Sequence, residues 1–283
     1  MTPNALPPPS APDLAPLIAR ARAADGQPPF SDQSLVDLRQ GTRTLLTVDD
    51  AVAIVGQGEA EFVVDPDARG RGNGTAMLER IIAGTTGDLL VWAHGDHPAA
   101  RALAASHGLD AVRRLLQLEK ERIELVEIPP TNFAGEVPTN STRYAAFRVG
   151  TDEPAWVALN ARIFAFHSEQ GSVTRTDLEE LETEGWFDPD DFLVAWDGDT
   201  MVGYCWLKIE GGSGEIYVIG VAPEKQGTGL GRALMAAGYA RLAGRGIRAV
   251  HLYVEGDNEK AISLYRSLGF TDLSVDIQYR LAR

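Results

Sequence analysis

The feature that constrains the fold most is a glycine-rich stretch that occurs twice in this chain of 283 residues. In the second half, an apolar run ending at Val221 enters a loop with glycines at 227, 229 and 231, and a helical pattern follows. In the first half, Pro66 aligns with Pro223, and glycines at 70, 72 and 74 align with those three, always at an offset of 157 (223 − 66 and 231 − 74). A match at one fixed offset indicates an internal duplication, so we predict two copies of one domain.

Each copy of this stretch is a strand that feeds a glycine-rich turn and then opens a helix. Small residues let several backbone N–H groups converge, and the helix N-terminus adds partial positive charge. Such a site favours a phosphate or a pyrophosphate. The spacing is not that of a dinucleotide fingerprint, and no Gly-Lys-Ser/Thr closes the loop as in a P-loop.

The later parts of the two halves match at an offset of 161 (267 − 106), because Ser106-His107-Gly108-Leu109 aligns with Ser267-Leu268-Gly269-Phe270. We expect each copy to contain helices, an antiparallel meander, the glycine loop with its helix, one more strand, a helix and a final strand. This order predicts the α/β class, with a mixed, mostly antiparallel sheet flanked by helices. The predicted helices are 14–24, 152–165 and 176–184, with a cap at Ser31, and the predicted strands are 44–48, 51–55, 89–93, 115–123, 144–149, 192–196, 201–209, 215–221, 249–254 and 275–281.

Two stretches without periodicity divide the chain. Residues 1–16 hold six prolines and indicate a flexible lead-in. Residues 128–142 are rich in Pro, Gly, Thr and Asn, which is typical of a linker. The predicted domains are therefore residues 17–127 and residues 143–283.

Composition excludes several classes of function. The formal net charge of −14 argues against nucleic acid as a partner, because duplex binding needs a basic face. No apolar run approaches the roughly 20 residues of a membrane span, and no secretion signal is visible. The single cysteine, Cys205, fits a reducing compartment, so we expect a cytoplasmic protein. His94 and His97 have no partners spaced for zinc, so we expect no metal.

A second motif follows the strand at 249–254. The order Asn258, Ala261, Leu264-Tyr265, Gly269-Phe270, together with Val221-x-Pro223-x-x-Gln226-x-x-Gly229-x-Gly231, resembles the two signatures of the GNAT acetyltransferase superfamily. The resemblance implies that acetyl-CoA is the co-substrate. The residues that match cofactor contacts are, in the second copy, Ile219, Gly220, Val221, Gln226, Gly227, Thr228, Gly229, Leu230, Gly231, Arg232, Asn258, Glu259, Lys260, Ala261, Ile262 and Ser263, and, in the first copy, Phe62, Val63, Val64, Arg69, Gly70, Arg71, Gly72, Asn73 and Gly74.

Within that superfamily, the tandem arrangement and several segments resemble the mycothiol synthase family. These segments run from Phe166 to Gly171, from Glu215 to Val221 and from Leu252 to Asn258. The resemblance implies transfer of acetyl to the cysteinyl amine of a cysteinyl-glucosaminyl-inositol, the last step of mycothiol synthesis. The matching acceptor contacts are Asp32, which replaces a glutamate of the family, Glu169, Lys208, Glu215 and Tyr253. We expect a monomer, because the duplication supplies the pairing that many GNAT enzymes reach by dimerising.

Glu215 and Tyr265 are the candidate catalytic residues that the resemblance implies. A carboxylate at the start of the central strand can relay the proton of an amine, whose reference pKa of about 7.8 makes deprotonation cost only about 1 kcal/mol. A phenol near the thioester sulfur can protonate the leaving thiolate, a transfer that is uphill by about 2 kcal/mol. The alternatives are a solvated strand end for Glu215 and packing on a helix for Tyr265. His251 is interpreted as a packed histidine rather than a ligand.

The two copies differ at the candidate catalytic positions. By the two offsets, Glu215 corresponds to Gly58, Tyr265 to Ala104 and Asn258 to His97. We therefore expect the second copy to be catalytic, and the first to be a degenerate domain that keeps an acetyl-CoA site. Two alternatives stay open, namely acetylation of another small amine or a protein N-terminus, and a non-catalytic acetyl-CoA-binding module.

Overall fold

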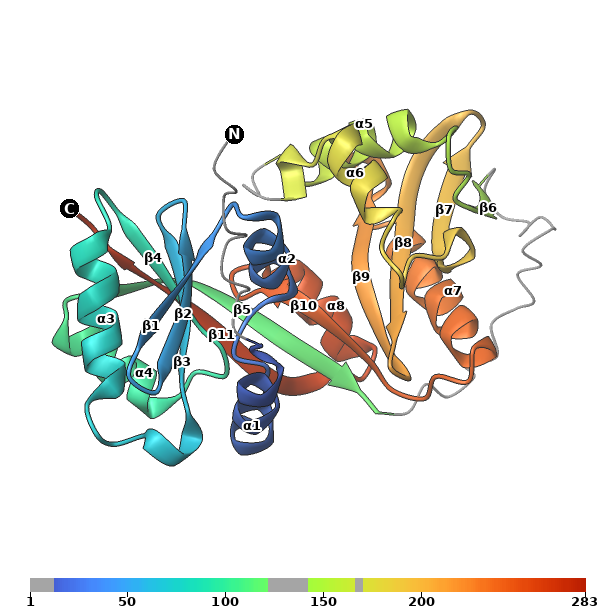
Figure 1. Cartoon of the computed structure of the whole chain (residues 1–283). Coiled ribbons are helices and arrows are strands. Elements are labelled where there is room, and N and C mark those ends of the chain that lie inside the picture. The colour runs from blue at the N-terminus through green and yellow to red at the C-terminus, as the bar shows by residue number, and fades with distance from the viewer. Residues whose placement is uncertain (1–12, 122–141, 166–169) are drawn as a thin grey trace, which may run out of the picture. The chain divides into compact units, whose positions relative to one another are not determined.

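The structure of the chain, a computed structural model, describes residues 13–121, 142–165 and 170–283 (Figure 1). Most of the predicted lead-in, nearly all of the predicted linker and Glu169 lie outside the described residues. Two compact units are present. Unit 1 comprises the described part of Met1–Gln117 with Val254–Ser263 and Asp272–Arg283, and unit 2 comprises the described part of Leu118–Tyr253 with Leu264–Thr271.

Unit 1 is a sheet with helices on both faces, in the strand order β1-β2-β3-β4-β11-β5. Alternate residues of β2 face opposite layers, since Ala51 and Ala53 pack with Met77 of α3, whereas Ile54 packs with Ala21 of α1. The elements are α1 (Ala15–Asp25), α2 (Asp32–Gln40), β1 (Thr44–Val48), β2 (Ala51–Gly56), β3 (Glu59–Val64), the 3-10 turn η1 (Pro66–Ala68), α3 (Asn73–Gly84), β4 (Leu89–Ala93), α4 (Pro98–Ser106), β5 (Asp110–Lys120) and β11 (Thr271–Leu281).

The last strand of the chain belongs to unit 1 (Figure 1). β11 pairs antiparallel with β4, with Ile277 opposite Ala93 and Leu281 opposite Leu89. Ile277 and Tyr279 of β11 are buried in the same core as α3 and β4. The duplication in sequence and the compact units in space therefore differ, because unit 1 takes β11 from the second sequence copy.

Unit 2 contains the strands β10-β9-β8-β7-β6, which pair in that order. On β8, Tyr204 and Trp206 pack with Trp156 of α5, while Cys205 lies against Gly238 of α7, where an added Cβ would come within 3.0 Å of its sulfur. The elements are β6 (Thr142–Ala146), α5 (Glu153–Ile163), η2 (Gln170–Ser172), α6 (Arg175–Leu181), η3 (Pro189–Asp191), β7 (Phe192–Asp197), β8 (Thr200–Glu210), β9 (Ser213–Val221), η4 (Pro223–Lys225), α7 (Leu230–Gly244), β10 (Val250–Glu255) and α8 (Glu259–Ser267), whose first five residues fall in unit 1.

The element bounds follow the two sequence offsets. η1 and η4 are 157 residues apart, and α4 and α8 as well as β5 and β11 are 161 apart at both ends. The predicted cap is confirmed, because the Ser34 N–H donates to Ser31 Oγ at 3.1 Å. β5 and β11 both begin earlier than predicted, because their first residues are exposed and lack a buried apolar pattern. Across the described residues, no helix is long and apolar enough to cross a membrane.

Candidate functional site

The two glycine loops have the same backbone conformation. Gly70 and Gly72 have φ angles of 74° and 90°, and Gly227 and Gly229 have φ angles of 76° and 91°. A Cβ added at any of these four positions would meet nothing within 4 Å, so the loop backbone is open to a ligand. The helices α3 and α7 start directly after Gly72 and Gly229, which directs the amides of their first turns at the loop. Both loops have the open backbone and helix N-terminus that suit an anion.

The third glycine of each loop lets its helix pack closely. A Cβ at Gly74 would come within 3.2 Å of Leu103 and 3.6 Å of Val64. A Cβ at Gly231 would come within 3.7 Å of Val221 and 3.8 Å of Leu264, the counterparts of Val64 and Leu103. The predicted duplication is therefore reproduced down to individual contacts.

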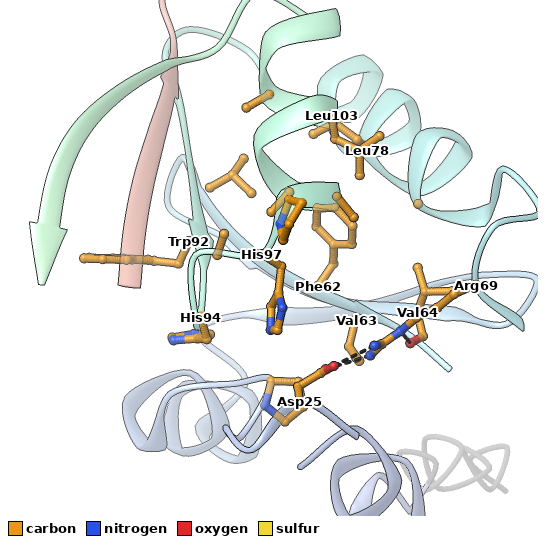
Figure 2. Close-up of a pocket in the computed structure, with 18 of the residues that line it drawn as sticks. Asp25, Phe62, Val63, Val64, Arg69, Leu78, Trp92, His94, His97 and Leu103 are labelled. Atoms are coloured by element: carbon orange, nitrogen blue, oxygen red, sulfur yellow. Dashed lines mark hydrogen bonds and ion pairs between the residues drawn. The ribbon is translucent and has the colours of Figure 1, made fainter. Parts of the chain in front are cut away.

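In unit 1 the loop opens into a pocket of about 590 Å³ (Figure 2). β3 and β4 pair in parallel over Glu59–Glu61 and Leu90–Trp92, and the pocket lies where the strands continue beyond those pairs. Eight of the nine residues predicted to bind the cofactor in the first copy line this pocket. The ninth, Arg71, is exposed and donates to the Asp67 carbonyl at 3.0 Å.

Arg69 lies at the rim of this pocket and binds Asp25 at the end of α1 (Figure 2). Its two terminal nitrogens donate to the two carboxylate oxygens at 2.6 and 2.7 Å. This hydrogen bonding lowers the pKa of Asp25. The counterpart of Arg69 in unit 2 is the uncharged Gln226, so this ion pair has no equivalent at that position of the second loop.

His94, which lines the same pocket, belongs to a charged cluster behind it. His94 lies between two carboxylates, with Nδ1 3.0 Å from Asp276 Oδ2 and Nε2 3.2 Å from Glu61 Oε2. Ser31 and Ser34 also donate to Glu61, at 2.5 to 2.8 Å. Burial opposes charge here, but hydrogen bonding with Asp276 and Glu61 outweighs it and raises the pKa of His94 to about 10. Burial also disfavours the charged form of Glu61. Hydrogen bonds from His94 and the two serines outweigh this effect and lower the pKa of Glu61 to about 2.

In unit 2, Glu215 lies between two basic side chains on neighbouring strands. Lys208 of β8 and His251 of β10 are its register partners, so all three side chains share one face of the sheet. His251 Nε2 is 3.4 Å from Glu215 Oε2, and His251 Nδ1 is 3.4 Å from Ser213 Oγ. The interpretation of His251 as a packed histidine is therefore incomplete, because it contacts the candidate base. The parallel pairing of β9 with β10, which places His251 opposite Glu215, was the signal that could have revealed this contact.

Tyr265 is buried on α8, with 7% of its surface exposed. Its ring packs edge-on against Phe270 at 5.8 Å, and burial raises its pKa, so the phenol stays protonated at neutral pH. The C-terminal turn of α8 is joined to the start of α7, because Arg232 donates to Ser267 Oγ at 2.9 Å. Tyr265 is thereby held on a helix that packs beside the second glycine loop.

The strand that carries Glu215 has a β-bulge. The β8–β9 register shifts between Trp206, opposite Val218, and Leu207, opposite Ile216, so Tyr217 is the additional residue. A bulge interrupts the ladder and re-aims side chains. In unit 1, β2 and β3 pair without a shift from Ala51 to Gly56, and the strands turn at Gln57 and Gly58. The counterpart of Glu215 is thus a turn residue.

The other predicted residues are distributed over both units. Asp32 is the first residue of α2 in unit 1, and Tyr253 on β10 is 41% exposed. The second cofactor set is divided, because 219–221 and 226–232 belong to unit 2 and 258–263 to unit 1. Within that set, Asn258 caps α8, since its Oδ1 accepts the Ala261 N–H at 3.1 Å. No cluster of three or more metal-binding side chains occurs among the described residues.

Known structures share this fold. A tandem GNAT protein from the clavulanic acid biosynthesis pathway superimposes with a TM-score of 0.67 at 15% identity, covering 94% of this chain and 93% of the other. A GCN5-related N-acetyltransferase from Sphaerobacter thermophilus gives a TM-score of 0.64 at 24% identity, covering 95% and 91%. The predicted fold class, a tandem GNAT arrangement, is therefore confirmed.

Sequence comparisons agree. The acetyltransferase (GNAT) family matches residues 160–270, in the second copy. A mycothiol acetyltransferase from Clavibacter michiganensis is 47% identical over 93% of this chain and 89% of its own length. One from Kocuria rhizophila is 44% identical over 95% of both. The chain therefore belongs to the mycothiol acetyltransferase family.

Proposed function

We propose that unit 2 transfers acetyl from acetyl-CoA to the cysteinyl amine of cysteinyl-glucosaminyl-inositol, completing mycothiol synthesis, and that unit 1 holds acetyl-CoA without turnover. The family supplies the reaction class. The observation that carries the assignment to unit 2 is the placement of Glu215 between Lys208 and His251, on a bulged strand that leads into a glycine loop.

Glu215 is the general base in this proposal. The attacking cysteinyl amine loses its proton to the carboxylate, directly or through a water molecule, as the N–C bond forms at the thioester carbonyl. His251 is a positioning residue, which fixes the carboxylate through Nε2 and connects it to Ser213 on the exposed side. Lys208 stands next to the carboxylate and supplies a donor for hydroxyl oxygens of the sugar or inositol.

Tyr265 is the general acid. When the tetrahedral intermediate collapses, the C–S bond breaks and the thiolate of CoA takes the phenolic proton. Because burial raises the pKa of Tyr265 further above that of the CoA thiol, this proton transfer is uphill, and the phenol assists by donating a hydrogen bond as negative charge develops on the sulfur. Its contribution to the rate is moderate.

Both loops fit the pyrophosphate of acetyl-CoA, because each combines open glycine backbone with a helix N-terminus. We further expect a cytoplasmic monomer. Asp32 and Glu169 complete the acceptor contacts in the proposal, which rests for these two residues on the family pattern alone.

The test is an acetylation assay with purified cysteinyl-glucosaminyl-inositol. Since this acceptor carries its own thiol, product is quantified by mass rather than by thiol release. We expect an acetylated product that needs the free amine, with no product from the N-blocked acceptor. Turnover of an unrelated amine but not of this acceptor would refute the substrate assignment, and no turnover on any amine would refute the enzyme assignment.

A further inference from the structure

The pocket of unit 1 does not end at its glycine loop but continues into the hydrophobic core. Five residues line the pocket and also belong to the core cluster of unit 1, and each is at most 8% exposed, namely Leu78, Val91, Ala104, Leu109 and Tyr279. They come from α3, β4, α4, the start of β5 and β11. The inner end of the pocket is therefore an apolar chamber enclosed by the core. Figure 2 shows Leu78 and Leu103 on the side of the pocket away from Asp25.

The same place in unit 2 is filled by aromatic rings. Tyr265 packs against Phe270 at 5.8 Å, and Phe270 lies 6.4 Å from Tyr239. The counterparts in unit 1 are smaller, because Ala104 stands for Tyr265 (offset 161), Leu109 for Phe270 (offset 161) and Ile82 for Tyr239 (offset 157). Three aromatic residues are thus exchanged for an alanine and two aliphatic residues between equivalent helices. Of these three residues of unit 1, Ala104 and Leu109 line the pocket, so the chamber lies where Tyr265 and Phe270 stand in unit 2.

The position of the chamber fixes which part of a ligand would reach it. The anion site lies at Gly70 to Gly74, at the start of α3, and the pocket runs from there along Phe62–Val64 of β3 to Ala104 of α4. The pyrophosphate of a CoA thioester lies between its adenosine and its acylated pantetheine, and we take the pantetheine end to be the one directed at α4, because Ala104 occupies the position of Tyr265. That end carries the acyl group, and Ala104 holds the place of the tyrosine assigned to the thioester sulfur in unit 2.

We propose that unit 1 binds CoA thioesters with a short aliphatic acyl chain, such as butyryl or hexanoyl, and houses the chain in the chamber beside Ala104 and Leu109. The inference rests on the proposal that unit 1 holds a CoA thioester. The chamber walls at these positions are aliphatic, so a chain that ends in a carboxylate, such as succinyl, is excluded by its desolvation cost. Unit 2 cannot accept the longer chain at this place, because Tyr265 and Phe270 fill it.

Native mass spectrometry and calorimetry on the full chain test the proposal with acetyl-CoA, hexanoyl-CoA and succinyl-CoA. We expect two acetyl-CoA but one hexanoyl-CoA per chain, with hexanoyl-CoA bound at least about tenfold tighter than acetyl-CoA at that site, since each buried methylene adds about fourfold. Ala104→Phe restores a ring and should abolish hexanoyl-CoA binding while two acetyl-CoA still bind. Ala105→Phe, on the exposed side of the same helix, should change neither.

The outcomes separate the two proposals. Two acetyl-CoA with no hexanoyl-CoA overturns the chamber and leaves unit 1 as an acetyl-CoA site. One acetyl-CoA and no hexanoyl-CoA overturns both. Hexanoyl-CoA binding that survives Ala104→Phe, in a variant whose circular dichroism matches the parent, places the chain elsewhere and overturns the inference. Ala104→Leu serves the same comparison if the phenylalanine variant does not fold.

Discussion

The two glycine loops of this chain are nearly identical in backbone, yet the residues around them differ. The φ angles of Gly72 and Gly229 agree within a degree, and both precede a helix. The two copies differ in the strand that precedes the loop and in a helix that follows later in the chain. The strand before the second loop extends back to Glu215, and a later helix, α8, carries Tyr265, whereas the equivalent positions in unit 1 are Gly58 and Ala104. In the proposed assignment, cofactor binding and catalysis are therefore separable, because they reside in different residues of the same domain.

The hairpin length is the structural cause of the first difference. β2 and β3 turn at Gln57-Gly58, and β8 and β9 turn at Gly211-Gly212 after longer strands. The additional residues of β8 and β9 carry Lys208 and Glu215, and the bulge at Tyr217 lies between this pair and the loop. In unit 1 the position that corresponds to Glu215 is part of the hairpin turn, so no strand residue is available there to act as a base.

The largest expected effect is on turnover. We predict that Glu215→Gln combined with Tyr265→Phe lowers kcat by about 10²- to 10⁴-fold, because both proton transfers lose their group. Steady-state kinetics with cysteinyl-glucosaminyl-inositol measures this, and calorimetry with acetyl-CoA shows whether both sites still bind. Unchanged kcat in the double variant would contradict the assignment of catalysis to unit 2.

The next largest effect is on the stability of unit 1. His94→Ala leaves Glu61 and Asp276 as buried carboxylates without their cation, so we expect a loss of about 3–5 kcal/mol in the free energy of unfolding. Urea denaturation measures it. His251→Ala is the matched control, since Glu215 lies at the partly exposed site in unit 2, and it should cost far less. Equal losses in both variants would contradict a special role for the cluster.

The same cluster predicts a pH dependence. His94 has a folded pKa of about 10 against an ordinary value of 6.5, so its stabilisation is complete below pH 6.5 and is lost as the pH rises towards 10. Glu61 has a folded pKa of about 2 against 4.5, so its share is present above pH 4.5 and is lost as the pH falls towards 2. We predict that, in His94→Gln, the free energy of unfolding no longer falls as the pH rises from 7 to 10. A free energy of unfolding of the parent protein that does not change between pH 7 and 10 would contradict the stabilising role of charged His94.

The smallest predicted effect concerns His251. His251→Gln keeps a nitrogen near Glu215 but removes the imidazole ring, so we expect kcat to fall by about tenfold or less through poorer placement of the base. The KM for acetyl-CoA should not change. The pH profile of kcat distinguishes positioning from packing, because a purely structural residue would leave its shape unaltered.

Much of the fold could be predicted from the sequence, because local signals specify it. The glycine positions, the cap at Ser31 and the offsets of 157 and 161 all appear in the structure where the pattern placed them. Eight of the residues predicted for the first cofactor site line one pocket. The glycine turns and helix starts could be predicted because they depend on neighbouring residues, whereas the cofactor site stays a prediction.

Long-range pairing could not be predicted. The sequence indicates that 275–281 is a strand, but not that β11 pairs with β4, since strand partners are chosen by tertiary packing. The cluster of Glu61, His94 and Asp276 escaped for the same reason, because Asp276 is 182 residues from His94. The bulge at Tyr217 shifts the β8–β9 register by one residue, and the hydrophobic periodicity of β9 does not reveal such a shift.

The most direct test of the central claim substitutes the equivalent loop glycines. Gly229→Val and Gly72→Val put the same side chain at the same backbone conformation, in the path of the pyrophosphate. We predict that Gly229→Val lowers kcat/KM for acetyl-CoA by about tenfold or more. Gly72→Val should leave it within about threefold while removing one of two bound acetyl-CoA molecules. A loss of turnover in folded Gly72→Val as large as that in Gly229→Val would contradict the division of labour between the units.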